Sequence, residues 1–481
     1  MRIFKIVVAI STLLQGLTIT IAAQAAEAVS EPDEHQNIVM IVVDDLRPVL
    51  GVYGDQKAHT PNIDALANRG VTFTHAYANV PVCGASRASM LTGLRPTKDR
   101  FWDYKAKAQD DVPGAKSLPQ VLREAGYYTM AIGKIFHHSS DLADVSWSQR
   151  PQSAGMSHAT ALNPESEQYQ KPRANNPNVF KGPWYEYANV ENEAYPDGRV
   201  KEKALDALEE LSKNDQPFFL SVGFIRPHLP FYAPERYYDL HPEDKFTPFF
   251  HREKPSGAPE SLKGSGEIRS YHFRDYEYNS DAFHVSSQRG YYASVSYIDA
   301  LVGDITKQIQ ALGLEKNTTL VFLSDHGFNL GEHNFWTKHN LLDTAMRIPV
   351  ILAGPNIAEN QKTNALIELV DIFPTVTEIA SVTHAEDIAG ESFVHVLENP
   401  ELDHKQQIYA RFKAGDAVVS HKGIFASYMT DTAARDEMFF DLVSDPHETQ
   451  NVVDQSAYST VTHALRELLN NCIEKQKCET Q

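Results

Sequence analysis

Short apolar runs rich in β-branched residues recur up to about residue 375, separated by segments with helical spacing. Residues 37–43 read Asn-Ile-Val-Met-Ile-Val-Val, which is typical of a central parallel strand buried on both faces. Shorter runs of the same type lie at residues 128–132, 319–323 and 350–352. Before the run at 319–323, apolar residues repeat on one helix face, at Tyr292, Val295, Ile298, Val302 and Ile305. This alternation predicts an open α/β sheet flanked by helices.

The alternation of strand-like and helical segments is interrupted twice and becomes weaker towards the C-terminus. Residues 140–196 and 242–288 are polar and show little periodicity, and insertions of this length in a compact domain usually form functional loops. From residue 396 onward, three strand-like runs precede a helix that places Val461, Leu465 and Leu468 on one face. We predict a main N-terminal domain over residues 26–395. A smaller C-terminal α+β subdomain with a short antiparallel sheet is predicted over residues 396–481.

The first 25 residues have the pattern of a secretory signal peptide. A short basic start with Arg2 and Lys5 precedes an apolar stretch, and Ala23-Gln24-Ala25 forms a small-x-small cleavage site. A membrane anchor is the alternative, but the apolar stretch is short and is interrupted by Ser, Thr and Gln. We therefore expect export to the periplasm or the medium, without stable insertion into a membrane.

Composition and charge narrow the class of protein. With 42 % hydrophobic and 22 % charged residues, the 481-residue chain is neither disordered, nor a coiled coil, nor a polytopic membrane protein. It carries 44 Lys and Arg against 63 Asp and Glu, a net charge of −19. The chain is therefore a poor candidate for binding nucleic acid through bulk charge, and a polyanionic substrate would need a local basic pocket.

Three cysteines are few for an exported chain, and their positions suggest different roles. Cys472 and Cys478 are six residues apart and could close a small disulfide loop. Cys83 is then left alone, and an odd cysteine in an oxidising compartment calls for an explanation.

Two predicted buried strands are each followed by a pair of residues that contains at least one aspartate. Asp44 and Asp45 follow the first strand, and Asp325 and His326 follow the strand at 319–323. In open α/β sheets ligands bind beyond the carboxyl ends of the strands, so both pairs are expected at one site. Turn or helix-cap roles are the alternative reading. A cation between the pairs would offset their repulsion, and the oxygen-rich set favours Ca²⁺ over Mg²⁺.

Cys83 opens the motif Cys-Gly-Ala-Ser-Arg, which leads into a short helix that Gly93 should end. At a helix N-terminus the backbone N–H groups and the helix dipole favour an anion. This placement, with Arg87 one turn further along, indicates a nucleophile beside an anion site. A buried structural cysteine explains the same residue equally well.

Together, Cys-x-x-Ser-Arg and the following Leu-Thr-Gly resemble the maturation signature of type I sulfatases in the alkaline phosphatase superfamily. Further blocks resemble iduronate-2-sulfatase-like enzymes and occur in family order, for example Arg-Pro-His-Leu-Pro at 226–230 and Ser-Asp-His-Gly at 324–327. Other matching blocks lie at residues 43–48, 60–64, 133–137, 331–333, 336–338, 368–375 and 441–446. One residue departs from the family pattern: Ala85 stands where the family usually has Pro.

The resemblance implies an alkaline phosphatase-like fold with a large mixed, mostly parallel central sheet, in which the N-terminal domain is catalytic. It implies that a formylglycine-generating maturation enzyme oxidises Cys83 to formylglycine. One hydroxyl of the hydrated aldehyde attacks sulfur, and the other expels sulfate by C–O cleavage. The implied ligands of a divalent ion, Ca²⁺ before Mg²⁺, are Asp44, Asp45, Cys83, Asp325 and His326.

The remaining site residues are also assigned by resemblance. Lys134 and Lys338 bind the developing charge, and Arg87 holds the formylglycine. His228 protonates the leaving alcohol, and His137 takes the proton from the remaining hydroxyl. His138 competes with His137 for this role, since the two are adjacent in the sequence.

Substrate contacts and substrate class are implied more loosely. Trp336 and Arg226 are assigned to the sugar, and a place in the core is the alternative for Trp336. The implied substrate is a sulfated carbohydrate, possibly a uronic acid 2-O-sulfate. Two other functions share parts of this pattern: a formylglycine-dependent phosphonate or phosphodiester hydrolase, and a non-catalytic carbohydrate-binding relative.

Overall fold

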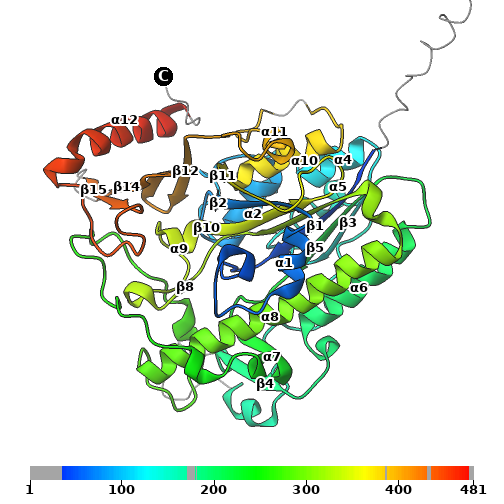
Figure 1. Ribbon diagram of the computed structural model, residues 1–481, viewed down its shortest axis with the longest axis horizontal. Coiled ribbons are helices and arrows are strands. Elements are labelled where there is room, and N and C mark those ends of the chain that lie inside the picture. The colour runs from blue at the N-terminus through cyan, green and yellow to red at the C-terminus, as the bar shows by residue number, and fades with distance from the viewer. Residues whose placement is uncertain (1–34, 171–178, 180, 385–386, 431–434, 476–481) are drawn as a thin grey trace, which may run out of the picture. The chain divides into compact units, whose positions relative to one another are not determined.

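A seven-stranded sheet forms the centre of the protein (Figure 1). The computed structural model describes residues 35–170, 179, 181–384, 387–430 and 435–475, so the predicted signal peptide lies outside the described residues. The strand order is β11-β2-β10-β7-β1-β5-β3. The bounds are β1 Asn37–Val43, β2 Gly70–Tyr77, β3 Tyr128–Gly133, β5 Phe218–Phe224, β7 Thr318–Ser324, β10 Arg347–Ala353 and β11 Gln361–Glu368.

Strand directions confirm the predicted mixed, mostly parallel sheet. β1 pairs in parallel with β5 and β7, β3 with β5, and β11 with β2. β10 alone among the strands of this sheet runs the other way, because it pairs antiparallel with both β2 and β7. The carboxyl ends of β7, β1, β5 and β3 therefore meet at one edge.

Each face of the sheet is covered by its own set of helices (Figure 1). Val39 and Ile41 of β1 pack on one side, and Ile38 and Met40 on the other, because side chains alternate along a strand. The first face carries α1 (Pro61–Ala67), α6 (Pro196–Leu211) and α8 (Asp281–Ala311). The second carries α2 (Cys83–Thr92), α4 (Leu118–Glu124), α10 (Ile372–Ile379) and α11 (Val394–Glu398).

Short elements fill the long polar segments between these helices. Two small pairings are formed by β4 (Tyr185–Ala188) with β6 (Phe231–Pro234), and by β8 (Asn329–Leu330) with β9 (Trp336–Thr337). The short helices are α3 (Ala108–Asp111), α5 (Ala143–Ser146), α7 (Glu235–Asp239) and α9 (Asp343–Met346). None of the helices in the described part of the chain combines the length and the apolar character that a membrane crossing requires.

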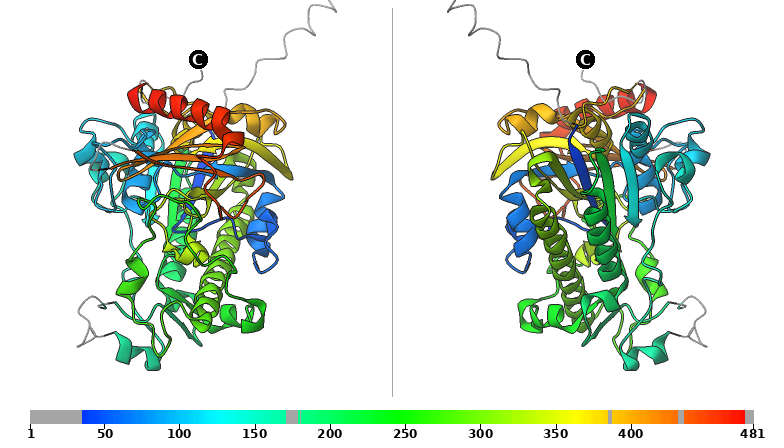
Figure 2. Two further views of the ribbon diagram at one scale, coloured as in Figure 1. Left: turned by 90° about the vertical axis from the view of Figure 1, so that its left-hand side faces the viewer. Right: turned by 90° about the vertical axis from the view of Figure 1, so that its right-hand side faces the viewer.

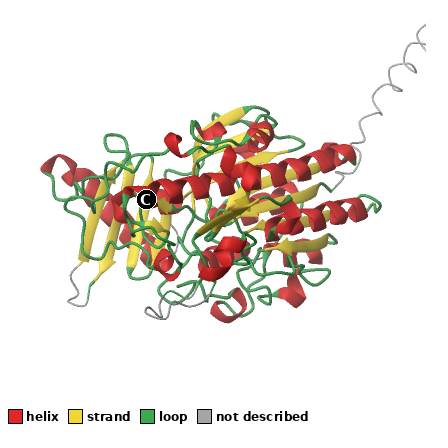
Figure 3. Cartoon of the chain, turned by 90° about the horizontal axis from the view of Figure 1, so that it is seen from below, coloured by secondary structure: helices red, strands yellow, loops and turns green. Residues whose placement is uncertain are grey.

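The C-terminal part forms a separate antiparallel sheet (Figure 3). Its strands are β12 (Gln407–Phe412), β13 (Gly415–Ser420), β14 (Gly423–Met429) and β15 (Arg435–Asp441). One face packs on Leu341, Leu342 and Met346. The other face is covered by α12 (Ser459–Lys475), which lies along the sheet in Figure 2. The predicted small antiparallel sheet is thus confirmed, while the boundary predicted after residue 395 falls inside α11 and stays a prediction.

The helix α12 carries one half of the predicted C-terminal cysteine pair. Cys472 is buried against the small sheet and is disulfide-bonded. Cys478 lies outside the described residues. Cys83 is a free, buried cysteine.

A buried ion network ties the small sheet to the central one. Lys405, just before β12, contacts Glu368 Oε1 at 2.8 Å and Asp371 Oδ1 at 2.5 Å through its Nζ. Arg95, which follows α2, pairs with the same Glu368. His404 Nε2 lies 3.4 Å from Asp371 Oδ2. Each carboxylate thus has cationic partners, as buried charges require.

Candidate active site

The structure brings the two acidic pairs together at the edge where the parallel strands end. Asp44 and Asp45 follow β1, and Asp325 and His326 follow its neighbour β7. The backbone N–H of Asp45 donates to Asp325 Oδ1 at 3.2 Å. His326 Nε2 lies 3.4 Å from Asp45 Oδ1. Four potential oxygen and nitrogen ligands from two strands therefore face one point, as ligand sites in such sheets do.

These residues have the chemistry of a cation site. Ligand atoms of four buried residues all lie within 4.8 Å of one another, namely those of Asp44, Cys83, Asp325 and His326. Among the described residues, Asp44 Oδ1 and Asp45 Oδ1 are buried without a hydrogen-bond partner. His326 Nδ1 donates to the carbonyl of Gly327 at 3.0 Å, which leaves Nε2 able to bind a metal.

Electrostatics in this cluster also favour a cation. Burial raises the pKa of Asp45 to about 7, against the opposing effects of Lys338 and His326. Burial acts on Asp44 in the same direction, but the nearby charges of Lys134, His228 and Arg87 outweigh it and hold the pKa well below its usual range. A divalent ion would offset the cost of burying Asp45 as a carboxylate, so the donor set fits a hard, oxygen-seeking cation.

Cys83 is the first residue of α2 and points into this cluster. The helix ends as predicted, with Gly93 in the left-handed region at φ 67°. Cys83 is 3 % exposed, and its Sγ lies 3.2 Å from His326 Nε2. Burial raises the pKa of the thiol well above its usual value, and Asp44 adds to the effect. An unmodified Cys83 is therefore a neutral thiol, which is a poor nucleophile.

Arg87 lies one turn further along α2 and joins three parts of the site. Its Nε donates to Asp325 Oδ2 at 2.8 Å, and its Nη2 lies 3.5 Å from Asp44 Oδ1. Its Nη1 donates to the carbonyl oxygens of Lys134 and Ile135. The side chain is fully buried, so it fixes the helix of Cys83 against the strand ends.

Two lysines stand beside the acidic cluster. Lys134 follows β3 and pairs with Asp44, and Lys338 follows β9 with its Nζ 3.0 Å from Asp45 Oδ2. The backbone turns at Gly133 with φ 79°, where a Cβ atom would lie 2.0 Å from the carbonyl oxygen of Gly223. Glycine at this position lets β3 and β5 approach closely enough to direct Lys134 inward.

His228 lies on a loop after β5, next to the cluster. Its Nδ1 is 2.5 Å from the carbonyl oxygen of Leu229, so Nδ1 carries a hydrogen and Nε2 faces the site. Nε2 lies 4.0 Å from Asp45 Oδ2. Arg226 stabilises this loop, because its guanidinium donates to the backbone carbonyls of Tyr232, His228 and His158.

His137 lies on the loop after Lys134, and its ring faces Tyr104 at 6.2 Å and His138 at 4.9 Å. Burial and, to a smaller extent, the nearby ammonium of Lys134 lower the pKa of His137 to about 3. His137 is therefore neutral and can accept a proton. The choice between His137 and His138 stays a prediction.

Glu267 is a site residue that the sequence analysis missed. Its Oε1 lies 3.2 Å from His228 Nε2, and its Oε2 lies 3.0 Å from Lys338 Nζ. It belongs to the polar segment 242–288, which was expected to form a functional loop, but no motif marks this residue. Glu267 contacts His228 and Lys338 only because its loop folds back over the strand ends.

The two residues predicted to contact the substrate, Trp336 and Arg226, are both buried. Trp336 is 1 % exposed, its ring packs against Phe283 and His284, and its Nε1 donates to Asn279. Arg226 is buried under the His228 loop. Their contact with a substrate stays a prediction, and the positions described here support neighbouring side chains.

Comparison with known proteins agrees with this geometry. The model of the sulfatase family matches residues 36–382, and that of the C-terminal part of N-sulphoglucosamine sulphohydrolase matches residues 331–475. Iduronate 2-sulfatase of Mus musculus is 32 % identical over 77 % of this chain and 73 % of its own length.

Solved structures share the fold at lower identity. A structure in complex with D-glucosamine-2-N,6-O-disulfate has a TM-score of 0.72 at 22 % identity, covering 92 % of this chain and 98 % of that one. Phosphonate monoester hydrolase from Silicibacter pomeroyi has a TM-score of 0.74 at 19 % identity, covering 91 % and 95 %. The family match spans most of the sequence and includes every strand of the central sheet, so this chain belongs to the sulfatase family and is a sulfuric ester hydrolase.

Proposed function

We propose that this sulfatase is exported, matures by oxidation of Cys83 to formylglycine, and removes sulfate from a sulfated sugar with the help of Ca²⁺. The observation that carries the proposal is the position of Cys83 at the N-terminus of α2, against two carboxylate-bearing strand ends and near two lysines. Similarity to iduronate 2-sulfatase favours a uronic acid 2-O-sulfate as the group that is cleaved.

The cation would be held by Asp44, Asp45, Asp325 and His326, together with the modified side chain of residue 83. When bound, such an ion polarises sulfate oxygens and lowers the pKa of a hydroxyl next to it. Formylglycine supplies two hydroxyls on one carbon when hydrated.

Side chains of the protein would bind the sulfate, transfer protons and position residue 83. Lys134 and Lys338 flank the cluster and would bind the sulfate oxygens as negative charge develops on them. His228 would protonate the leaving sugar oxygen from Nε2 in its doubly protonated form, which the Glu267 carboxylate at 3.2 Å favours. His137, neutral beside Lys134, would accept the proton from the hydroxyl that remains. Arg87 keeps residue 83 in line with the strand ends.

Glu267 is proposed as a positioning residue for His228 and Lys338. Glu267→Gln should lower kcat/KM for a sugar sulfate by about 10- to 100-fold, the size typical of losing a supporting contact behind a working group. The loss should be smaller for 4-nitrophenyl sulfate, because its leaving group needs no proton from His228 and only the contact of Glu267 with Lys338 then matters. Equal losses on both substrates would contradict a role of Glu267 through His228. Glu260→Gln, at an exposed acid of the same segment, is the matched control.

Two measurements test the proposed function together. Mass spectrometry of the peptide across Cys83 should show formylglycine when the chain is produced with a maturation enzyme. The matured protein should then hydrolyse sulfated disaccharides faster than a phosphodiester or a phosphonate monoester on the same preparation. Faster cleavage of either phosphorus ester would contradict the assignment.

Export is tested by the N-terminus of the mature protein, which should be Ala26.

Removal of the cation should affect activity and stability at once. Incubation with a chelator should reduce turnover to the background level and lower the melting temperature, because the folded state then loses a bound ligand and one oxygen each of Asp44 and Asp45 is left without a partner. Readdition of Ca²⁺ should restore both quantities at a lower concentration than Mg²⁺. Activity and melting temperature that do not respond to the chelator would contradict the metal assignment.

A further inference from the structure

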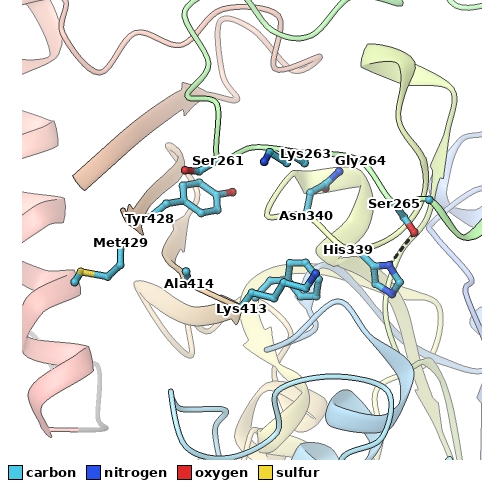
Figure 4. Close-up of a pocket in the computed structure, with 12 residues that line it drawn as sticks. Ser261, Lys263, Gly264, Ser265, His339, Asn340, Lys413, Ala414, Tyr428 and Met429 are labelled. Atoms are coloured by element: carbon cyan, nitrogen blue, oxygen red, sulfur yellow. Dashed lines mark hydrogen bonds between the residues drawn. The ribbon is translucent and has the colours of Figure 1, made fainter. Parts of the chain in front are cut away.

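A cavity of about 440 Å³ lies between the loop before Glu267 and the edge of the C-terminal sheet (Figure 4). Its walls come from Ser261–Gly266, from His339 and Asn340, from the turn between β12 and β13, and from the end of β14. The volume falls in the range of about 300–1,000 Å³ that is usual for small-ligand sites.

Chain connectivity places this cavity next to the catalytic cluster. His339 directly follows Lys338, and Gly266 directly precedes Glu267. These two site residues contact each other at 3.0 Å. The two wall segments are also joined to each other, because His339 Nδ1 lies 2.8 Å from Ser265 Oγ. This contact is the dashed line in Figure 4. A ligand in the cavity would therefore be a close neighbour of the group whose sulfate is cleaved.

Two polar groups in the wall lack a partner in the described part of the protein. Asn340 is 2 % exposed and Tyr428 is 6 % exposed, yet Asn340 Nδ2 and Tyr428 Oη make no hydrogen bond there. The amide oxygen of Asn340 is used, since it accepts from the backbone N–H of Leu342 at 3.3 Å. Unpaired buried polar groups cost free energy, and a hydroxyl-rich ligand would supply the missing partners.

The charge of the wall differs from that of the whole protein. Among the residues that the structure describes, the lining includes Lys263 and Lys413 and contains no carboxylate side chain, whereas the chain as a whole carries a net charge of −19. Both lysines are exposed at the rim. A ligand that pairs with them would be anionic, and one that also satisfies Asn340 and Tyr428 would carry hydroxyl groups.

The surface continues from this cavity into a second one of about 470 Å³. Ala414 and Met429 line both cavities. The second is lined by Lys98 and by Trp102, whose ring is 42 % exposed, and also by Asp99, Arg411 and Asp416. An exposed tryptophan beside a cation suits the apolar face of a sugar ring that bears an acidic group. The two cavities together offer room for more than one unit of a chain-like ligand.

We propose that the cavity at Lys263, Asn340, Lys413 and Tyr428 is a subsite for an anionic sugar unit next to the one that carries the cleaved sulfate. The second cavity at Trp102 extends this subsite along the same polysaccharide. The proposal rests on the proposed function and specifies its substrate class: an oligosaccharide or polymer with acidic units, in preference to an isolated monosaccharide sulfate.

Titration calorimetry with hexasaccharides of chondroitin sulfate and heparan sulfate tests this subsite directly. The double variant K263Q/K413Q should bind the preferred hexasaccharide at least tenfold more weakly than the wild type, and Tyr428→Phe about threefold to tenfold more weakly. The wild-type affinity should fall as salt increases. Lys422→Gln, in the β13–β14 turn of the same sheet, is the matched control and should bind as the wild type does. Equal binding by the double variant, or binding of neither hexasaccharide by the wild type, would overturn the proposal.

Turnover separates this proposal from the catalytic one. In the double variant, the ratio of kcat/KM for the hexasaccharide to that for 4-nitrophenyl sulfate should fall at least tenfold, and an unchanged ratio would contradict the subsite. Failure of the wild type to hydrolyse any sulfate ester would contradict the proposed function. The calorimetric comparison would still decide the subsite in that case, because it requires no turnover.

Discussion

Replacement of Cys83 by alanine or serine is expected to lower the turnover of sulfate esters by at least about 10⁴-fold. The residue stands at the centre of the site, with Lys134 and Lys338 on either side of the acidic cluster and His326 at 3.2 Å from its sulfur. Alanine provides no oxygen at this point. Serine provides one hydroxyl, but the proposed reaction needs a second hydroxyl on the same carbon to expel sulfate.

The fold should survive both replacements. Ala85, Ala88 and Met90 hold α2 in the core, and Arg87 anchors it to Asp325, so the helix does not depend on the sulfur of Cys83. Turnover measured together with thermal unfolding and with Ca²⁺ binding checks this expectation. A variant that keeps more than one hundredth of the wild-type activity would contradict the role of residue 83 as nucleophile.

Lys405→Met is expected to destabilise the protein by about 3–5 kcal/mol, the cost typical of breaking a buried ion pair from one side. The change leaves Glu368 and Asp371 buried with less compensation, since Lys405 contacts both. Urea unfolding monitors the loss. Lys422→Met, at an exposed position of the same sheet, should change the free energy of unfolding by less than about 0.5 kcal/mol.

The same variant should change the dependence of stability on pH. Burial would raise the pKa of Glu368 and of Asp371, but Arg95 and Lys405 outweigh this effect, and both pKa values lie below normal. Carboxylates with depressed pKa values in the folded state stabilise it above their unfolded pKa values, near pH 4, and lose this contribution as the pH falls. The deficit of Lys405→Met should therefore be largest above about pH 5 and shrink under acidic conditions. A deficit that is constant from pH 7 to pH 3 would contradict an ionic origin.

The sequence by itself determined much of the central sheet and the positions of the acidic pairs. β1 and β7 were recognisable because strands buried on both faces need continuous β-branched and apolar residues. The helix that begins at Cys83 and ends at Gly93 was recognisable from its end signals. β2, β5 and β11 were missed, since polar or small residues such as Thr74, Ser221 and Asn364 interrupt their apolar pattern.

Only the tertiary structure decided the direction of β10 and the role of Glu267. A two-residue periodicity reads the same in both directions, so no local pattern could show that β10 runs against its neighbours. Glu267 reaches His228 and Lys338 because a polar loop folds back over strands that are distant in the sequence. The contacts of such a loop depend on packing against surfaces that exist only after the chain has folded, whereas the strand ends carry their chemistry in adjacent residues.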